Sequence, residues 1–468
     1  MSEERQHFLD WFFYPRNIAV VGASRNPSRP NFYLFRNLIG LGFKGKVYPV
    51  NPNADEIQGI KVYPRLKDIE DEIDLVICAA SAPITLDVIK DCVEKKVKGV
   101  VIVSGGFSEI GQEGVKSQDE IAHLLKESGI RATGPNTLGP INTSNNLAVS
   151  FHPINQLRPG KLAFVFQSGL YEPRLSWIFS DFHLGISKLI DLGNKMDIDE
   201  TEVLEYLAND PDTETIAIHL ENIKGDGRKF LRLLKETSRK KPVVILKSGR
   251  TPAGAKAAMS HTGAIIQGSD AVFDAVVRQS GVIRAQSLEE FFELAKAFEF
   301  LPPPNNNRIV VATGPGGEGV MAADFCQQSG LSLAELNPET LSKLKPIFPP
   351  WEIRGNPFDL GVCLEFHVSE PIFGMFLNSV VSDENVDCVA IQLLVSEWAP
   401  VEDFAELFSK AAEKGKPITA WLAGTSEKAN NIIEKLEAKH IPVYTSAETA
   451  IKVLSALRKY KVMQEQKM

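Results

Sequence analysis

The feature that most constrains the fold of this chain is a regular alternation of short β-branched runs with longer amphipathic segments. Such alternation is typical of parallel sheets covered by helices. Three of the runs lead into a turn that contains glycine, at residues 22–25, 167–169 and 314–319. The pattern predicts an α/β protein with three domains in series.

The expected strands form three sets. They are residues 18–21, 46–50, 75–78, 99–103 and 130–133, then 161–166, 215–220 and 242–246, and finally 308–312, 386–392, 418–422 and 442–444. Residues 302–307, Pro-Pro-Pro-Asn-Asn-Asn, suit neither a helix nor a central strand and indicate a linker. We expect a doubly wound domain over residues 1–145 and two more α/β domains over 146–300 and 308–468. The last helix is expected over 447–461, followed by a frayed tail.

The composition excludes several classes of protein. The 468 residues are 44% hydrophobic and 24% charged, and a net charge of -8 without a basic block argues against nucleic acid as the main partner. No apolar run is long enough to span a bilayer, and the N-terminus lacks the apolar core of a signal peptide. The five scattered cysteines predict reduced packing residues in a cytoplasmic protein, with no metal site.

A tight turn, Gly22-Ala23-Ser24-Arg25, follows the first expected strand and precedes a helical segment. Backbone N–H groups at such a turn can receive a phosphate or pyrophosphate. Most glycines of a GxGxxG motif are missing, so a purely structural turn explains the segment equally well. The second strand runs into Val50-Asn51-Pro52-Asn53 without the acidic residue that reads the ribose of NAD. A CoA-type nucleotide therefore suits this edge better than NAD, and a dehydrogenase is disfavoured.

The last of the three turns is the richest in glycine, with the sequence Gly314-Pro315-Gly316-Gly317-Glu318-Gly319. It would let a phosphate meet bare backbone at a helix start, but it lacks the Lys-Ser/Thr of an ATPase P-loop. A loop that only needs positive φ angles is the alternative. The middle turn, Gln167-Ser168-Gly169, offers the Ser168 hydroxyl as a donor. Pro173 predicts that the following helix starts nearer Glu172 than Ser168.

A histidine without bulky neighbours, His261, lies in the run Ser260-His261-Thr262-Gly263 after the strand at 242–246. We expect a Gly-rich loop whose imidazole can move and meet a phosphate, although most histidines in polar loops are solvated and have no function. Glu221 follows the strand at 215–220, at a carboxyl edge. Its carboxylate could hold the other nitrogen of His261, and a surface glutamate is the alternative. We interpret His219 as a core residue.

Several segments together resemble the nucleoside-diphosphate-forming acyl-CoA synthetases of the succinyl-CoA synthetase superfamily. The resemblance is carried by residues 18–24, 42–53, 104–111, 134–136, 192–195, 210–213, 247–263 and 314–319. It extends over nearly the whole chain and is most specific in Lys247-Ser248-Gly249-Arg250 with Ser260–Gly263. It implies a CoA-binding, Rossmann-like domain followed by two flavodoxin-like ligase domains.

The resemblance also implies an acid–thiol ligase that works through a phosphohistidine. Acyl-CoA and phosphate would give an acyl phosphate and CoA, the acyl phosphate would phosphorylate His261, and the phosphoryl group would pass to ADP. Glu221 aligns with the carboxylate that steadies the histidine. Gln167, Ser168 and Gly169, with Gly316, Gly317 and Gly319, align with two helix N-termini that stabilise the phosphohistidine. The residues expected to bind CoA are Gly22, Ala23, Ser24, Arg25, Val50, Asn51, Pro52, Asn53, Ala80 and Ser104.

Two segments depart from the pattern of this family, and one expected module is missing. Residues 170–174 replace a small-residue stretch, which suggests an atypical acyl group, and residues 26–31 replace a Gly-Lys turn beside the CoA edge. A non-catalytic CoA-binding or regulatory protein that kept the fold is the alternative. No segment after Pro304 has the pattern of an ATP-grasp domain. The resemblance therefore implies that ATP or ADP with Mg²⁺ is bound mainly by a partner β subunit in a heterotetramer.

Overall fold

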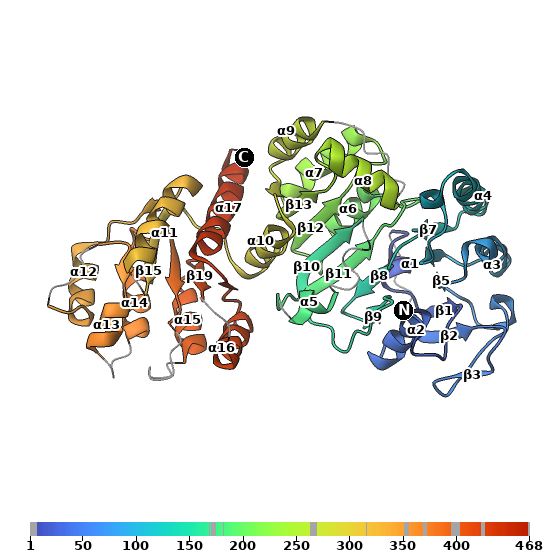
Figure 1. Cartoon of the computed structure of the whole chain (residues 1–468), viewed down its shortest axis with the longest axis horizontal. Helices are drawn as coiled ribbons and strands as arrows, with labels where there is room; N and C mark the ends of the chain where they lie inside the picture. Colours follow the sequence, from blue (N-terminus) through green and yellow to red (C-terminus); the bar gives the residue numbers. More distant parts are fainter. Residues whose placement is uncertain are drawn as a thin grey trace. The chain divides into compact units, whose positions relative to one another are not determined.

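The structure is a computed structural model that describes residues 7–167, 169, 175–180, 182–262, 269–314, 316–350, 355–367, 372–394, 403–422 and 426–466. They belong to two compact units, Met1–Ser287 and Leu288–Met468. Both units consist of parallel sheets and helices (Figure 1). Among the described residues, no helix combines the length and the apolar character that a bilayer crossing requires.

The first sheet of the N-terminal unit is parallel throughout and has the strand order β2-β1-β5-β6-β7. Its strands are β1 (Asn17–Val21), β2 (Lys46–Val50), β5 (Leu75–Cys78), β6 (Gly99–Ile102) and β7 (Arg131–Thr133). This is the doubly wound order in which the chain reverses direction across β1, so a crevice forms between β1 and β5 at their carboxyl ends. The expected doubly wound fold is confirmed.

Helices and short elements complete this part of the unit. They are α1 (Asp10–Phe13), α2 (Asn31–Gly40), α3 (Ala82–Lys95), α4 (Gln112–Ser128), the 3₁₀ turns η1 (Leu66–Asp68) and η2 (Ser108–Ile110), and the hairpin strands β3 (Glu56–Ile57) and β4 (Ile60–Lys61). The helix α3 ends at Lys95, and Lys96 adopts a left-handed conformation that closes the helix.

The second sheet repeats the same order and adds an antiparallel hairpin at one edge. It runs β14-β13-β12-β10-β11-β8-β9, and only β8 and β9 are antiparallel to their neighbours. The strands are β8 (Pro140–Asn142), β9 (Leu147–Ala148), β10 (Pro159–Phe166), β11 (Ile186–Asp191), β12 (Thr215–Leu220), β13 (Val243–Lys247) and β14 (Ile283–Ala285). The helices are α5 (Leu175–Ser180), α6 (Glu200–Asn209), α7 (Gly227–Ser238), α8 (Pro252–Thr262) and α9 (Asp270–Ser280). Although β8 precedes residue 146, the expected start of the second domain, it pairs with this sheet.

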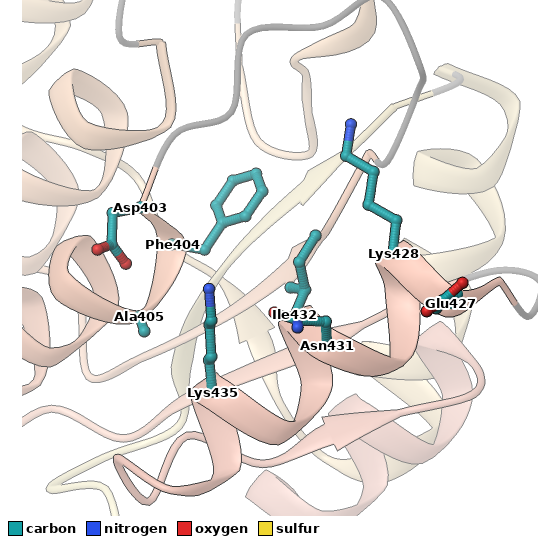
Figure 2. Close-up of a pocket in the computed structure, with 8 residues that line it drawn as sticks. All are labelled: Asp403, Phe404, Ala405, Glu427, Lys428, Asn431, Ile432 and Lys435. Atoms are coloured by element: carbon teal, nitrogen blue, oxygen red, sulfur yellow. The ribbon is translucent and has the colours of Figure 1, made fainter.

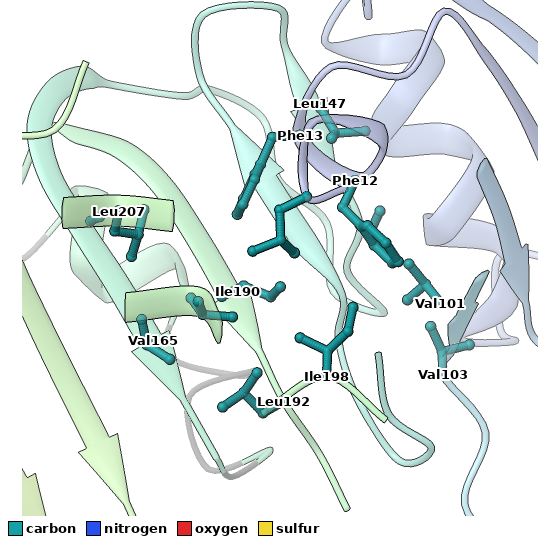
Figure 3. Close-up of a cluster of buried hydrophobic side chains, with 14 of the residues drawn as sticks. Phe12, Phe13, Val101, Val103, Leu147, Val165, Ile190, Leu192, Ile198 and Leu207 are labelled. Atoms are coloured by element: carbon teal, nitrogen blue, oxygen red, sulfur yellow. The ribbon is translucent and has the colours of Figure 1, made fainter. Parts of the chain in front are cut away.

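The first two sheets share one hydrophobic core, which explains why they form a single unit. Phe12 and Phe13 from α1 lie fully buried between Val101 of the first sheet and Ile190 of the second (Figure 3). Arg131 in β7 adds a polar clamp to the same junction. Its guanidinium donates to both carboxylate oxygens of Asp197 and of Glu202, at 2.9–3.1 Å.

The C-terminal unit holds a third parallel sheet with the order β16-β15-β18-β19-β20, and β17 pairs with the end of β15. Its strands are β15 (Arg308–Thr313), β16 (Ser332–Leu333), β17 (Phe358–Asp359), β18 (Cys388–Gln392), β19 (Ile418–Trp421) and β20 (Val443–Tyr444). Its helices are α10 (Leu288–Phe300), α11 (Gly316–Ser329), α12 (Pro338–Leu344), α13 (Gly361–Phe366), α14 (Ile372–Val381), α15 (Phe404–Ala412), α16 (Glu427–Glu437) and α17 (Ala447–Glu465), with the 3₁₀ turn η4 (Lys345–Ile347).

Two helices of this unit differ from the expectation. The helix α10, which falls within the expected second domain, packs against α17, and its buried Lys296 donates to Glu437 at 2.7 Å. The contacts therefore group α10 with the C-terminal unit. The final helix does not fray after Lys461 but continues to Glu465. Tyr460, which is buried against Phe298, anchors its last part.

Candidate active site

The three turns singled out in the sequence occupy equivalent places in the three sheets. Each follows the first strand of the parallel part of its sheet, β1, β10 or β15, and lies beside the crevice at which the strand order reverses. In open parallel sheets, ligands bind in that crevice at the carboxyl ends of the strands. The recurrence seen in the sequence is therefore a recurrence of potential binding sites.

Gly22, the first residue of the first turn, cannot be replaced without strain. Its φ is +85°, and a Cβ there would lie 3.0 Å from the carbonyl oxygen of Ala79, at the end of β5. Its N–H donates to the carbonyl of Val50 at 2.9 Å. A glycine is thus needed for both the backbone conformation and the close approach of the turn to its neighbours.

The residues expected to bind CoA come together along this edge. The Asn51 amide donates to the carbonyl of Ala23 at 2.8 Å, and the Ser104 hydroxyl donates to the carbonyl of Ala80 at 2.5 Å. Val50 is buried beneath them, whereas Ser24 is partly exposed. The remaining members of the set, Arg25, Pro52 and Asn53, are exposed. The carboxyl ends of β1, β2, β5 and β6 thus present a mixed polar and backbone surface to solvent.

The helix after this turn starts later than the sequence suggests. A helix directly after Gly22-Ala23-Ser24-Arg25 is expected, but α2 begins at Asn31, and Pro30 occupies its N-cap. Pro27 and Pro30 disfavour helical backbone at the residues before them, which delays the start. The Asn31 amide instead donates to the carbonyls of Gly22 and Ala79, at 3.2 and 3.3 Å. The turn is therefore fixed by side-chain amides and not by a helix that begins immediately.

In the second sheet, Gln167 and Glu221 face each other across the crevice between β10 and β12. Both are buried, with 4% and 7% of their surfaces exposed. The backbone N–H of Glu221 donates to Oε1 of Gln167 at 2.9 Å. Among the described residues, no atom lies within 4 Å of the position that a Cβ on Gly169 would take. Ser168 and residues 170–174 lie outside the described residues, and α5 begins at Leu175.

The backbone around His261 is helical, contrary to the expected loop. The helix α8 runs from Pro252 to Thr262 and includes His261 in its last turn. Alanines at four positions between 253 and 258 favour a helix, and Pro252 at the first position suits its start. The Thr251 hydroxyl accepts the N–H of Gly254 at 3.1 Å, which satisfies one donor of the first turn.

The helix α8, which includes His261 in its last turn, contacts η2 of the first sheet's domain. The side chain of His261 and the residues 263–268 lie outside the described part of the chain.

The third turn lies at the start of α11. Gly316 and Gly317 form its first turn and are exposed, whereas Gly319 is buried. None of the three has a positive φ, so the alternative of a loop that needs positive φ angles is wrong for them. Crowding explains two of them, because a Cβ on Gly316 would lie 2.9 Å from Asp359 and one on Gly319 would lie 3.2 Å from Pro357. A Cβ on Gly317 would meet no atom of the described part of the chain within 4 Å.

A chain of polar side chains without any local sequence signal fixes this turn. Oε1 of Gln392, at the end of β18, accepts the N–H of Gly314 at 2.6 Å, and its Nε2 donates to Glu318 at 2.6 Å. The indole of Trp421, at the end of β19, donates to the other oxygen of Glu318 at 2.8 Å. The three side chains come from three distant segments, so no local motif could reveal them.

Two further features lie near these edges but contain none of the expected site residues. His219 is buried in β12 and bonds to the Ser248 hydroxyl at 2.7 Å, and burial lowers its pKa to about 3, which agrees with a core residue.

A groove of about 670 Å³ lies between the starts of α15 and α16 (Figure 2). The groove is lined by residues that include Phe404 and Ile432 together with Lys428 and Lys435.

Family models match the chain in three consecutive segments. A CoA binding domain matches residues 16–143, a succinyl-CoA ligase like flavodoxin domain matches 159–298, and a ligase-CoA domain matches 309–467. These matches and the three crevices define a class of CoA ligase built from one CoA-binding domain and two ligase domains.

Individual relatives agree with this class. An ADP-forming acetate–CoA ligase II of Archaeoglobus fulgidus is 38% identical over 96% of this chain, which spans 66% of that ligase. The α subunit of the ADP-forming acetate–CoA ligase II of Pyrococcus furiosus is 37% identical, and 96% of this chain covers 97% of it. The solved acetyl-coenzyme A synthetase 1 of Ca. Korarchaeum cryptofilum, in complex with phosphate and ADP, superposes with a TM-score of 0.88 at 33% identity, covering 98% of this chain and 97% of that one.

The chain belongs to the family of ADP-forming acyl-CoA synthetases. The relatives are enzymes, so the comparisons do not favour the alternative of a non-catalytic CoA-binding protein.

Proposed function

We propose that this chain is the α-type subunit of an ADP-forming acyl-CoA synthetase. The enzyme interconverts acyl-CoA, ADP and phosphate with a carboxylic acid, ATP and CoA. The observation that carries the proposal is the pairing of Gln167 and Glu221 across the second crevice, in the same unit as the helix that holds His261. The burial of Glu221 beside the turn at Gln167, at the carboxyl edge of the sheet, supports the roles that the family resemblance implies for them.

The first sheet binds the CoA part of the substrate. Gly22 lets the turn pack closely against the backbone of Ala79, and Asn51 and Ser104 hold the neighbouring turns in place. A nucleotide with phosphates can reach the N–H groups of such an edge without meeting bulky side chains. Arg25 is exposed beside the turn and supplies a positive charge for a phosphate.

His261 acts as the nucleophile of the phosphoryl relay. Phosphate attacks the thioester carbonyl, the C–S bond breaks, and CoA leaves as the acyl phosphate forms. An imidazole nitrogen of His261 then attacks phosphorus, the bond between phosphorus and the acyl oxygen breaks, and the carboxylate leaves. The carboxylate of Glu221 holds the second imidazole nitrogen, which fixes the tautomer and stabilises the positive charge on the ring.

Bare backbone stabilises the phosphorylated ring. Gln167, Ser168 and Gly169 follow β10, and Gly316, Gly317 and Gly319 open α11. The open surroundings of Gly169 and Gly317 support this assignment, since no Cβ shields their N–H groups. Backbone amides at a helix start stabilise a dianionic phosphoryl group.

A partner β subunit of the ATP-grasp type binds ADP or ATP with Mg²⁺ and completes a heterotetramer. The nearly full coverage of the Pyrococcus α subunit supports this assignment, because that protein is named as one subunit of a ligase. The longer Archaeoglobus ligase, of which this chain spans 66%, is a single chain. The phosphoryl group of His261 passes to ADP held by the partner.

The test is covalent labelling of the complex with its ATP-grasp partner. Incubation with acetyl-CoA, labelled phosphate and Mg²⁺ should give an acid-labile, base-stable label on His261, located by mass spectrometry. His261→Ala should lose the label and more than 99% of turnover, whereas the surface control His123→Ala, 74% exposed in its side chain, should keep both. A wild-type complex that binds CoA without any label would contradict the proposal and indicate a regulatory protein.

A further inference from the structure

Lys195 lies buried beneath the two turns that form the second crevice. Its side chain is 1% exposed, and its ammonium group donates to Oε1 of Gln167 at 2.9 Å, to Oε2 of Glu200 at 2.8 Å and to the carbonyl of Asn222 at 2.8 Å. A lysine ammonium has three protons, so these contacts use its entire donor capacity. Lys195 therefore joins the turn after β10, the turn after β12 and the start of α6.

Gln167 is the centre of this connection. Its Oε1 accepts not only Lys195 but also the N–H groups of Glu221 and Asn222, at 2.9 and 3.2 Å. Its Nε2 donates to Oδ1 of Asn222 at 2.6 Å. Because an ammonium group can only donate, Lys195 acts together with these two N–H groups to fix which end of the Gln167 amide faces Glu221. Of the three donors on Oε1, Lys195 is the only side chain, and it links Gln167 to α6 through Glu200.

Stability alone does not account for an ion pair at this place. Glu200, the partner of Lys195, is fully buried, and its other oxygen accepts the N–H of Lys224 at 2.9 Å. Burial lowers the pKa of Lys195, and the charge of Glu200 opposes that shift. A buried ion pair is costly to desolvate and can often be replaced by apolar residues without loss of stability. The contacts of Lys195 with the crevice point to a role in positioning.

The third sheet provides an internal comparison. There, too, a glutamine crosses the crevice, since Gln392 accepts the N–H of Gly314 at 2.6 Å. The charged group behind it is a carboxylate, Glu318, which fixes the amide from its donor end. Both crevices thus depend on a glutamine whose orientation a charged side chain determines, and only the second uses a cation.

We propose that Lys195 is a positioning residue for phosphoryl transfer to and from His261. This role rests on the proposed function and extends it. By holding Gln167, Lys195 keeps the carboxylate-bearing residue Glu221 and the turn at Gln167–Gly169 at a fixed separation. Because its side chain is only 1% exposed, Lys195 acts through Gln167 and not by direct contact with CoA or the acyl group.

The experiment compares two matched double variants in the complex with the ATP-grasp partner. Lys195→Met/Glu200→Leu replaces the pair under the crevice with apolar groups of similar size, which avoids the unfolding that a lone buried charge would cause. The control, Lys188→Met/Asp210→Leu, replaces a pair of the same kind, with side chains 1% and 3% exposed and 2.8 Å apart. The Lys188 pair contacts Asp212 but neither Gln167 nor Asn222.

The measurements are the single-turnover rate of His261 phosphorylation, the KM for acetyl-CoA and the melting temperature. We expect the Lys195 double variant to phosphorylate His261 about a hundredfold more slowly with an unchanged KM, because a small displacement of catalytic groups costs about that factor. The control should phosphorylate His261 at the wild-type rate.

Three results would decide against the proposal. Equal phosphorylation rates in both double variants would overturn it. A raised KM with an unchanged rate would also overturn it, because it would assign Lys195 to CoA binding. An unlabelled wild-type complex would overturn the proposed function itself, and this role with it.

Discussion

Asp191 is a buried carboxylate next to the candidate site. It ends β11 with 1% of its surface exposed, and its oxygens accept the N–H groups of Leu138 and Gly193, at 3.0 and 3.3 Å. Burial raises the pKa of Asp191 to about 6, and the negative charge of Glu221 contributes to the same shift. Loss of its proton therefore opposes folding near neutral pH.

The sign of the resulting pH dependence follows from this raised pKa. Between about pH 4 and pH 6 the folded chain holds a proton that the unfolded chain has lost, so stability falls as the pH rises through this window. A shift of about two pKa units corresponds to ~3 kcal/mol. Compared with Asp191→Asn, the wild-type free energy of unfolding of the N-terminal unit should therefore fall by ~2 kcal/mol from pH 4 to pH 7 in urea titrations, because part of the total change lies below pH 4.

The exposed Asp71 is the control for this measurement. Its pKa is lowered by a hydrogen bond from Tyr48 and then by Lys46, so its contribution is present at neutral pH and is lost as the pH falls. The difference between wild type and Asp71→Asn should therefore change with pH in the opposite direction. A difference for Asp191→Asn that stays constant from pH 4 to pH 7 would rule out the raised pKa.

At the scale of the element, the start of α11 separates stability from function. No described residue lies within 4 Å of the position that a Cβ on Gly317 would take, and its φ is not positive. Gly317→Ala should therefore keep or raise the stability of the C-terminal unit, by up to about 1 kcal/mol. The added methyl covers backbone that the phosphoryl group would approach. We expect His261 phosphorylation to slow about tenfold, the loss that ~1.4 kcal/mol of transition-state stabilisation produces.

Gly316→Ala is the counterpart in the same turn. Its Cβ would lie 2.9 Å from Oδ2 of Asp359, so this variant should lower the melting temperature of the C-terminal unit. Wild-type phosphorylation by Gly317→Ala would show that the open backbone of α11 takes no part in the relay.

Most strands could be predicted from the sequence because they are short, mainly apolar runs that contain β-branched residues. The residues 46–50, 75–78 and 215–220 are strands with the expected limits. The strand β11 is not predictable in this way because Lys188 and Asp191 interrupt its apolar pattern, and only the fold shows that Asp210 pairs with Lys188. The two-residue strands β9, β16 and β17 are too short for any periodicity.

The turns of the candidate site could be predicted from the sequence, but the side chains that hold these turns in place could not. Glycines and the charged Glu221 mark strand ends in the sequence, and the structure places them at the three crevices. Two groups that hold these turns, Lys195 and Gln392, come from other segments. Residues 192–195 carry part of the family resemblance, but they do not reveal that Lys195 contacts Gln167, and Gln392 has no local signature. The helical backbone at His261 was not predicted from the sequence. The glycines and serines there indicate a loop, but the alanines between them favour a helix.

At the scale of the whole molecule, the separate cores of the two units predict separate unfolding. The first two sheets share one apolar cluster that includes Phe230, whereas Phe376 belongs to a cluster confined to the C-terminal unit. Calorimetry should show two transitions. Each of Phe230→Ala and Phe376→Ala should lower only the transition of its own unit, since loss of a buried phenyl ring costs about 3–5 kcal/mol. A shift of the same single transition by both variants would contradict this.

The hairpin of β8 and β9 also affects how readily the chain aggregates with other proteins. It closes the β11 side of the second sheet with a strand of two buried residues, Leu147 and Ala148, beside α2. An edge strand of two residues is too short to serve as a template on which a strand of another protein could extend the sheet. Aggregation by strand addition is therefore suppressed at this edge of the sheet. A subunit that docks there has to be recognised through side-chain contacts.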